Sequence, residues 1–103
     1  MEFLLEIVVH LTPDLNAASR EDLMAREHRA ARALIETGQL SRIWRIPGKQ
    51  GNWSIWNVTD ATALHACVSR LPMFPWMTIA VHPLAEHPLS ATPRISSDQE
   101  TAR

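Results

Sequence analysis

Glu27 is the residue whose surroundings in this sequence most favour chemistry. It lies in the middle of an apolar stripe that recurs at about 100° per residue along a predicted helix and comprises Leu23, Ala30, Ala31 and Leu34. Burial of an unpaired carboxylate is costly, and it raises the carboxyl pKa toward the range that suits a general base. A structural alternative stays open, in which Glu27 pairs with Arg42 or Arg45 or reaches solvent past the small alanines.

A second group of candidates lies between Ile43 and Val58, a segment that holds three of the four tryptophans and the only lysine, Lys49. Asn is a poor strand former, so Asn52 either ends the turn that begins at Gly48 or donates from its amide to a ligand carbonyl. The tryptophans either pack the hairpin or line a pocket. Alternation predicts two sets of side chains, one with Trp44, Ile46, Asn52, Ser54 and Trp56 and the other with Ile43, Arg45, Trp53 and Ile55.

The segment LPMFPWM, residues 71–77, connects a predicted helix to a predicted strand but carries hardly any polar side chain. Connections of this kind are normally solvated. Pro72 and Pro75 hold the residues before them extended, so Met73, Phe74 and Trp76 project from a stiff backbone. Such a segment either folds over the end of the core or contacts another subunit.

Other reaction classes lack the residues that they require. The five histidines show no metal-ligand spacing, Cys67 is the lone cysteine, and no G-x-S-x-G nucleophile motif occurs. Phosphate-binding loops are also missing, because the chain has only three glycines. We therefore expect no metal ion and no organic cofactor.

Composition indicates which kinds of partner the protein can bind. The net charge is −1 and the ten basic residues are scattered, which argues against nucleic acid. The apolar runs near the start are far too short to span a membrane, and they do not form a signal peptide, so a cytoplasmic protein is expected. Apolar residues make up 46% of a chain of 103 residues, so we expect part of the surface to meet a second subunit.

Six predicted elements must position the candidate residues. Alternation predicts a strand over residues 3–11, and the run before Gly38 predicts a helix over residues 20–36 with Ser19 and Asp22 as its capping box. Segments 40–46 and 52–58 flank the turn PGKQG and predict a hairpin. Thr59 is predicted to cap a second helix that ends before Pro72, and residues 77–84 are predicted to form the last strand.

This order predicts an α+β fold, a ferredoxin-like βαββαβ sandwich in which two helices cover one face of an antiparallel sheet. Residues 1–90 form the single predicted domain. Residues 91–103 are predicted to be a polar, flexible tail. The face of the sheet without helices carries tryptophan and aliphatic residues, so we expect a ligand or a partner subunit to cover it.

An ordered set of residues over roughly residues 1–90 resembles the muconolactone isomerase family of aromatic-degradation enzymes, whose relatives include chloromuconolactone dehalogenases. The set comprises Glu27, Gly38, Trp44, Arg45, Gly48, Asn52 with the aromatic Trp53 and Ser54, Leu64, His65, LPMFPW from Leu71, and His87 with Pro88. The resemblance implies the same ferredoxin-like fold. It also implies a homodecamer whose active sites are formed by two neighbouring subunits.

The resemblance implies a mechanism as well. Glu27 acts as a single base that removes a proton at C4 of a butenolide ring and returns it at C2, which gives 3-oxoadipate enol-lactone without a metal or an organic cofactor. Asn52 matches the residue best suited to donate to the lactone carbonyl oxygen. Lys49 and Arg45 are the candidates for binding the carboxylate arm of the lactone substrate.

The chain departs from the family pattern near the expected substrate. Gln50 stands where the family usually has a tyrosine that faces the substrate, and Trp53 replaces a second tyrosine. Plain, methylated and chlorinated lactones therefore all stay open as substrates. A halogen at C5 would make the same proton abstraction expel halide, as in a dehalogenase. A non-catalytic oligomer that binds a small ligand and a cofactor-free monooxygenase are the remaining alternatives.

Overall fold

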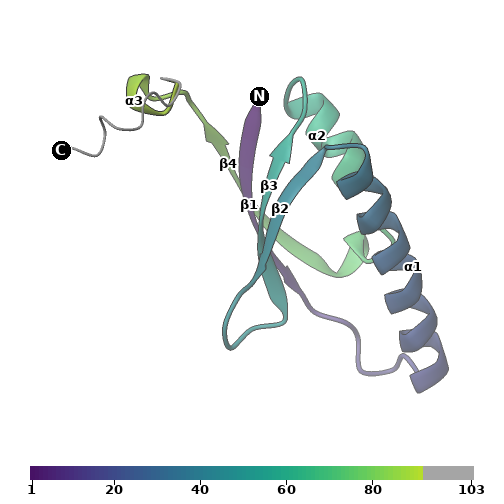
Figure 1. Cartoon of the computed structure of the whole chain (residues 1–103). Helices are drawn as coiled ribbons and strands as arrows, with labels where there is room; N and C mark the ends of the chain where they lie inside the picture. The colour runs from purple at the N-terminus through teal and green to yellow at the C-terminus, as the bar shows by residue number, and fades with distance from the viewer. Residues whose placement is uncertain (92–103) are drawn as a thin grey trace.

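Two helices cover one face of a four-stranded antiparallel sheet in the computed structural model, which describes residues 1–91 (Figure 1). The elements follow in the order β1 (Glu2–Val9), α1 (Ala17–Glu36), β2 (Leu40–Arg45), β3 (Gly51–Asn57), α2 (Ala61–Val68), the 3₁₀ turn η1 (Phe74–Trp76), β4 (Met77–Leu84) and α3 (Pro88–Ala91). The strand order is β2-β3-β1-β4. The predicted ferredoxin-like βαββαβ arrangement is therefore confirmed.

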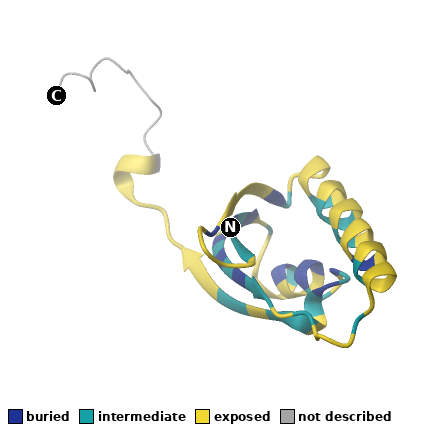
Figure 2. Cartoon of the chain, turned by 90° about the horizontal axis from the view of Figure 1, so that it is seen from below, coloured by how far each residue is buried: buried dark blue, intermediate teal, exposed yellow. Residues whose placement is uncertain are grey.

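Alternation in β1 sets the position of the core. Phe3, Leu5 and Ile7 point toward the helices and are at most 2% exposed. The core is completed by side chains from β2, β3, α2 and the segment that follows α2: Leu40, Trp56, Leu64, Cys67, Val68 and Leu71. Figure 2 shows the buried residues gathered where the sheet faces the helices, while the outer side of α1 is exposed.

The helix starts differ from those predicted. Asn16 caps α1, because its side-chain oxygen accepts the Ser19 N–H at 2.8 Å, so the predicted capping box of Ser19 with Asp22 is wrong. Asp60, and not Thr59, caps α2 through the Ala63 N–H at 2.9 Å. Both caps have an extended backbone, from which a short side-chain oxygen reaches the first free amides of the helix.

The register of the hairpin corrects the predicted grouping of side chains. Trp44 pairs with Trp53, and Arg45 pairs with Asn52. Because directly paired residues of antiparallel strands point to the same face, Arg45 and Asn52 share the helix-covered face, whereas the two tryptophans belong to the other face. The sequence grouped Trp44 with Asn52 because it did not account for the length of the connecting turn, which sets the register.

The last part of the described chain extends away from the sheet. β4 has the predicted bounds, and the single helical turn α3 that follows it was not predicted. α3 lies apart from the two larger helices, beyond the end of β4 (Figure 1). The polar tail predicted from residue 91 lies, apart from Ala91, outside the described residues. In the described part of the chain, no helix combines the length and apolar character needed to cross a membrane.

We predict that Ser54→Ala lowers the free energy of unfolding by about 1–3 kcal/mol. Ser54 and Trp56 are each 1% exposed, and Trp56 Nε1–H donates to Ser54 Oγ at 2.9 Å. The substitution leaves the indole N–H buried without this acceptor. Urea unfolding at one fixed protein concentration measures the loss.

Ser41→Ala is the matched control. The Ser41 hydroxyl donates to the Ile55 carbonyl at 3.2 Å, but it does so at an exposed position where water replaces the bond. Its loss is expected to stay within about 0.5 kcal/mol. Equal losses in the two variants would contradict the structural role of the Ser54–Trp56 pair.

Candidate active site

A cavity of about 420 Å³ lies between α1, the β2–β3 hairpin and the segment that precedes β4. Its size is within the range of about 300–1,000 Å³ that is usual for small-molecule sites. The cavity is lined by Val9, Glu27, His28, Ala31, Ile43, Trp44, Arg45, Gly51, Asn52, Met73 and Met77. Glu27 is therefore not directed into open solvent but faces a mostly apolar hollow.

The Glu27 carboxylate is half-buried and held by one backbone donor. Its Oε1 accepts the Met73 N–H at 2.9 Å. Burial raises the pKa of Glu27, and this effect outweighs the Met73 hydrogen bond and the charge of His28, both of which lower it. The predicted stripe is also present, since Leu23 is buried and Ala30, Ala31 and Leu34 pack against the core. A carboxylate with a raised pKa is a stronger base than an exposed glutamate.

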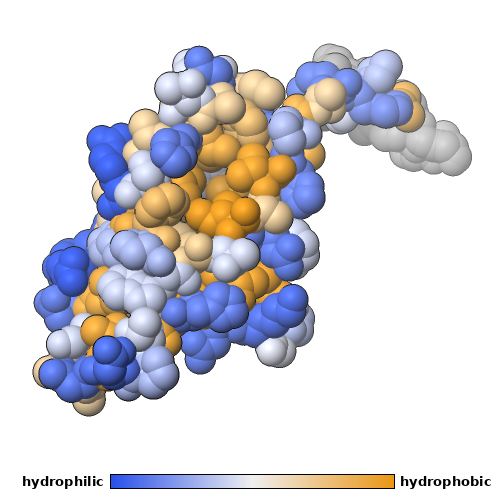
Figure 3. Space-filling model, turned by 180° about the vertical axis from the view of Figure 1, so that it is seen from behind, coloured by the Kyte–Doolittle hydropathy of each residue, from blue (hydrophilic) through white to orange (hydrophobic). Residues whose placement is uncertain are grey.

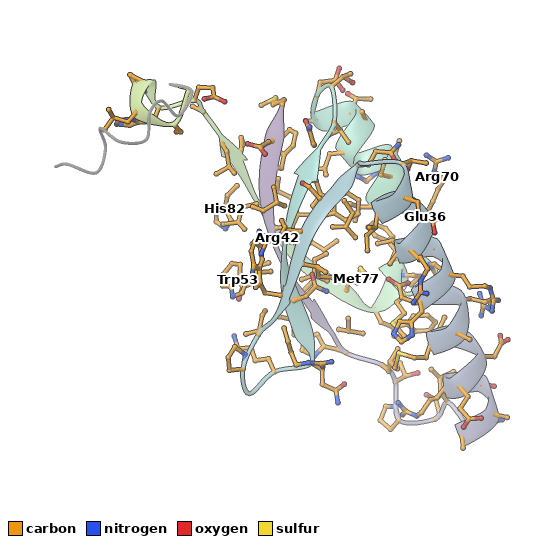
Figure 4. The ribbon with its side chains drawn as sticks, viewed as in Figure 1. Glu36, Arg42, Trp53, Arg70, Met77 and His82 are labelled. Carbon is orange, nitrogen blue, oxygen red and sulfur yellow. The ribbon has the colours of Figure 1, made fainter. Side chains whose placement is uncertain are left out.

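The structure does not contain the ion pair that was the alternative for Glu27. Within residues 1–91, no salt bridge joins it to Arg42 or Arg45. The Arg42 guanidinium instead lies 4.7 Å from the centre of the Trp44 ring. Figure 4 shows Arg42 and Trp53 on the side of the sheet away from α1, whereas Met77 lies between the sheet and that helix. Arg42 is thus excluded as the partner of Glu27 within one chain.

Asn52 and Arg45 form the wall of the cavity on the sheet. They are direct cross-strand neighbours on the helix-covered face. The Asn52 Oδ1 atom is buried, and within the described residues it has no hydrogen-bond partner. An unsatisfied buried polar atom costs about 1–3 kcal/mol, which a bound ligand would recover. A half-turn of the amide exchanges its oxygen and nitrogen, so the group can offer either an acceptor or a donor.

Gly51 fixes the position of the backbone at Asn52. A Cβ atom at position 51 would lie 2.1 Å from the Ile7 carbonyl oxygen and 3.0 Å from the Val8 Cα, so only glycine allows this approach of β3 to β1. The close pairing brings Asn52 opposite Ile7. The position of the amide is therefore set by the sheet and not by a flexible loop.

His28 is a cavity residue that the sequence interpretation missed. It is exposed, but it also lines the cavity, and its charge lowers the pKa of Glu27. The available signal was its spacing, because His28 precedes Ala31 by three residues and residues three apart share a helix face. His28 and Arg45 are the two basic side chains that line this cavity.

Three predicted substrate contacts lie elsewhere in the single chain. Lys49 Nζ is 3.9 Å from the Glu6 carboxylate, and Lys49 and Gln50 line a separate, more open hollow of about 650 Å³. This hollow is larger but contains no carboxylate in its wall, and it shares only Val9 with the Glu27 cavity. Trp53 pairs with Glu6 and Trp44 on the sheet face without helices. One chain therefore brings together Glu27, Asn52 and Arg45.

The tryptophans and the segment after α2 have divided roles. Trp56 is a core residue at 1% exposure. The register places the side chains of Trp44 and Trp53 on the sheet face without helices, although Trp44 is among the residues that line the cavity. Leu71 and Met73 are buried, so this segment folds over the end of the core, as the first of its two interpretations proposed. The resulting site combines a basic carboxylate, an amide and a guanidinium with apolar walls, which suits proton transfer on a small anion that carries a carbonyl group.

Comparison with known proteins gives the family. The family model described as muconolactone delta-isomerase matches residues 1–90. A muconolactone delta-isomerase of Cupriavidus pinatubonensis is 40% identical over 90 residues, which cover 87% of this chain and 98% of the relative. One of Pseudomonas aeruginosa is 36% identical, with 87% and 94% covered.

Solved structures agree with the comparison of sequences. A crystal structure of muconolactone isomerase at 3.3 Å resolution has a TM-score of 0.81 and 36% identity, and the match covers 95% of this chain and 98% of that one. A dehydrochlorinase of Burkholderia phenoliruptrix has a TM-score of 0.58 at 15% identity, a likeness that shows the fold alone. On the family match and these identities, the chain belongs to the muconolactone delta-isomerase family.

Proposed function

We propose that this protein is an isomerase that shifts the ring double bond of a muconolactone to give 3-oxoadipate enol-lactone, with Glu27 as its single catalytic base. The observation that carries the proposal is the half-buried Glu27 carboxylate in a cavity with Asn52 and Arg45, in a chain of this family. The name of the family supplies the substrate class, and the chemistry of the side chains supplies the roles.

The reaction balances with one base. Glu27 removes the proton at C4 of the lactone ring, and the electrons of the broken C–H bond form a dienolate with charge on the carbonyl oxygen. The same carboxyl group then returns the proton at C2, which completes the shift of the double bond. Since no electrons or protons are gained or lost overall, the proposed reaction needs no redox cofactor and no metal. The raised pKa of Glu27 suits both halves of this transfer.

Asn52 is the proposed donor to the charge that develops on the lactone carbonyl oxygen. Its amide lies in the cavity wall with a buried oxygen that lacks a partner among the described residues, so it is available to a ligand. With Nδ2 turned toward the carbonyl oxygen, one such hydrogen bond lowers a barrier of this kind by about 3 kcal/mol. The donor acts mainly in the transition state, because the oxygen gains its charge there.

Arg45 is the proposed clamp for the carboxylate arm of the substrate. It lies beside Asn52 on the same face, and a guanidinium can bind a carboxylate through two parallel hydrogen bonds. His28, when protonated, adds positive charge from the opposite wall on α1. Lys49 and Gln50 are proposed secondary contacts, since their hollow adjoins the cavity at Val9. Trp53 is a proposed contact only across a subunit boundary.

The protein is also proposed to form a homo-oligomer, a decamer in which neighbouring subunits share active sites. Val81, Leu84 and Leu89 are 46%, 40% and 79% exposed. An apolar groove of about 260 Å³ lies between α2 and β4, and Figure 3 shows apolar surface on the side of the molecule that faces away from the viewer in Figure 1. Exposed apolar surface of this kind is typical of subunit contacts.

The subunit count is predicted to exceed one at micromolar concentration. Sedimentation equilibrium measures the mass of the particle directly, and the expected mass is about ten times the 11.6 kDa of one chain. Val81→Asp is expected to lower the mass by placing a charge in the apolar groove, whereas Ala25→Asp, at an exposed position of α1, is the control. A particle of 11.6 kDa would contradict the oligomer.

Glu27→Gln is predicted to reduce kcat by roughly 10²- to 10⁴-fold, because the amide cannot accept the substrate proton. The product is followed by ultraviolet absorbance and by NMR on plain, methylated and chlorinated lactones, with halide release measured in parallel. Glu36→Gln, an exposed carboxylate on the same helix, is the control and should keep full activity. A Glu27→Gln enzyme that retains most of its turnover would refute Glu27 as the base.

The same variant should fold at least as stably as the unmodified protein at pH 8. The pKa of Glu27 is raised in the folded state, so ionisation of this group destabilises the fold above that pKa. The advantage of the variant should disappear below the pKa of glutamate in the unfolded chain, because the Glu27 carboxyl is then protonated in both the folded and the unfolded protein. Thermal unfolding at pH 8 and pH 4 checks the sign of this difference.

Kinetic constants should separate the roles of Arg45 and Asn52. Arg45→Gln is predicted to raise KM at least about tenfold with little change in kcat, because the carboxylate arm of the substrate is bound equally in the ground state and in the transition state. Asn52→Ala is predicted to lower kcat by about 10²-fold. Lys49→Gln is the comparison for Arg45, and a larger KM effect there would assign the carboxylate arm to Lys49.

A further inference from the structure

The only hydrogen bond of the Glu27 carboxylate within residues 1–91 comes from a backbone amide 46 residues away in the chain. Met73 N–H donates to Oε1 at 2.9 Å in a partly buried position. No hydrogen bond or ion pair to Oε2 is present among the described residues. The two oxygens of the carboxylate are thus not equivalent, because Oε1 is held by a hydrogen bond and Oε2 is not.

The segment that carries this amide is held at several points. The Phe74 N–H donates to the Leu71 carbonyl at 2.9 Å, and the Trp76 N–H donates to the Met73 carbonyl at 2.9 Å. At the far end, the Trp76 carbonyl accepts the His10 N–H at 2.8 Å, which ties the segment to the chain just after β1. Leu71 and Met73 are 6% and 4% exposed. The direction of the Met73 N–H is therefore fixed by backbone bonds and core packing.

We propose that the Met73 backbone N–H is a positioning group for the base, which holds Oε1 of Glu27 and leaves Oε2 as the oxygen that removes and returns the substrate proton. The inference rests on the proposed function for the identity of the reaction. It gives the apolar segment LPMFPWM a role, because the polar group that the site needs is supplied by the main chain. A side-chain donor would be free to rotate, whereas this donor cannot.

The charges around Glu27 are few. His28 on α1 and Arg45 on β2 are the charged or titratable side chains that line the cavity with it, while β1 and β4 contribute Val9 and Met77. The residues from Leu71 to Met77 carry no charged side chain. The Met73 hydrogen bond favours the ionised carboxylate and lowers the pKa of Glu27 against the effect of burial. Removal of this bond should therefore raise the pKa of Glu27.

The test replaces the Met73 N–H by an ester oxygen. Leucic acid, the hydroxy acid that corresponds to leucine, is incorporated at position 73, and Met73→Leu is the matched comparison because the two proteins then differ only in N–H against O. Relative to Met73→Leu, the ester should lower kcat about tenfold or more with KM changed by less than about threefold. The acidic limb of the kcat/KM profile should move to higher pH.

An ester at Phe74 is the control for damage to the segment. It removes the bond from the Phe74 N–H to the Leu71 carbonyl, in the same turn, without touching Glu27. Introduced into Met73→Leu, the ester at Phe74 should leave the acidic limb of the kcat/KM profile unchanged. A purely structural role for the Met73 bond predicts that both esters lower activity and stability while the acidic limb stays in place, and that result overturns the proposal.

Carboxyl NMR gives a readout that does not depend on activity. With glutamate labelled at its carboxyl carbon and Glu27→Gln used for assignment, the pKa of Glu27 should be higher in the ester at 73 than in Met73→Leu. In the unmodified protein, the Met73 amide proton should shift with the same pKa, and this shift should be absent in Glu27→Gln. If the unmodified protein lacks isomerase activity but shows these titrations, the proposed function fails, while the hydrogen bond that orients the Glu27 carboxylate stands. If neither titration is seen, the positioning role fails.

Discussion

A carboxylate held in a mostly apolar cavity by one backbone donor is the constraint on which the rest of the structure depends. Burial raises the pKa of Glu27, and the Met73 hydrogen bond limits that effect and holds one oxygen of the group. The carboxylate belongs to α1, and the amide belongs to the segment before β4, 46 residues further along the chain. The fold therefore has to bring two segments that are distant in sequence into contact at this point.

The sheet supplies the complementary half of the site. Arg45 and Asn52 face the helices because of the hairpin register, and the same register turns Trp44 and Trp53 toward the opposite face. The acid–base group is thus on a helix, and the proposed substrate contacts are on strands. Rigid elements on both sides suit a reaction in which one base must reach two carbons of the same ring.

Much of this could be predicted from the sequence, because the relevant signals are local. The period-two pattern of β1 and the apolar stripe around Glu27 depend only on backbone geometry and burial. The helix caps were misassigned because Ser19 and Asn16 both suit a capping position, and only the path of the preceding turn decides between them. The faces of Trp44 and Arg45 depend on the register of the hairpin, which single-strand alternation does not contain.

The remaining parts of the site depend on tertiary structure. The Met73–Glu27 hydrogen bond involves a main-chain amide, which has no residue-type signature in the sequence. His28 is exposed, so a pattern based on burial does not select it. Lys49 and Gln50 lie in the hairpin connection, and their separation from Glu27 follows from the twist and length of the hairpin.

The contact between Gly51 and the Ile7 carbonyl links recognition to folding. Because a side chain at position 51 would collide with the main chain of β1, the spacing between the two central strands also defines the depth at which the Asn52 amide enters the cavity. Divergence in this scaffold therefore cannot readily change the reach of that amide by moving its backbone. A larger or smaller substrate ring must therefore be accommodated by changes in the helix wall or in the turn of the hairpin. The two central strands then keep their positions.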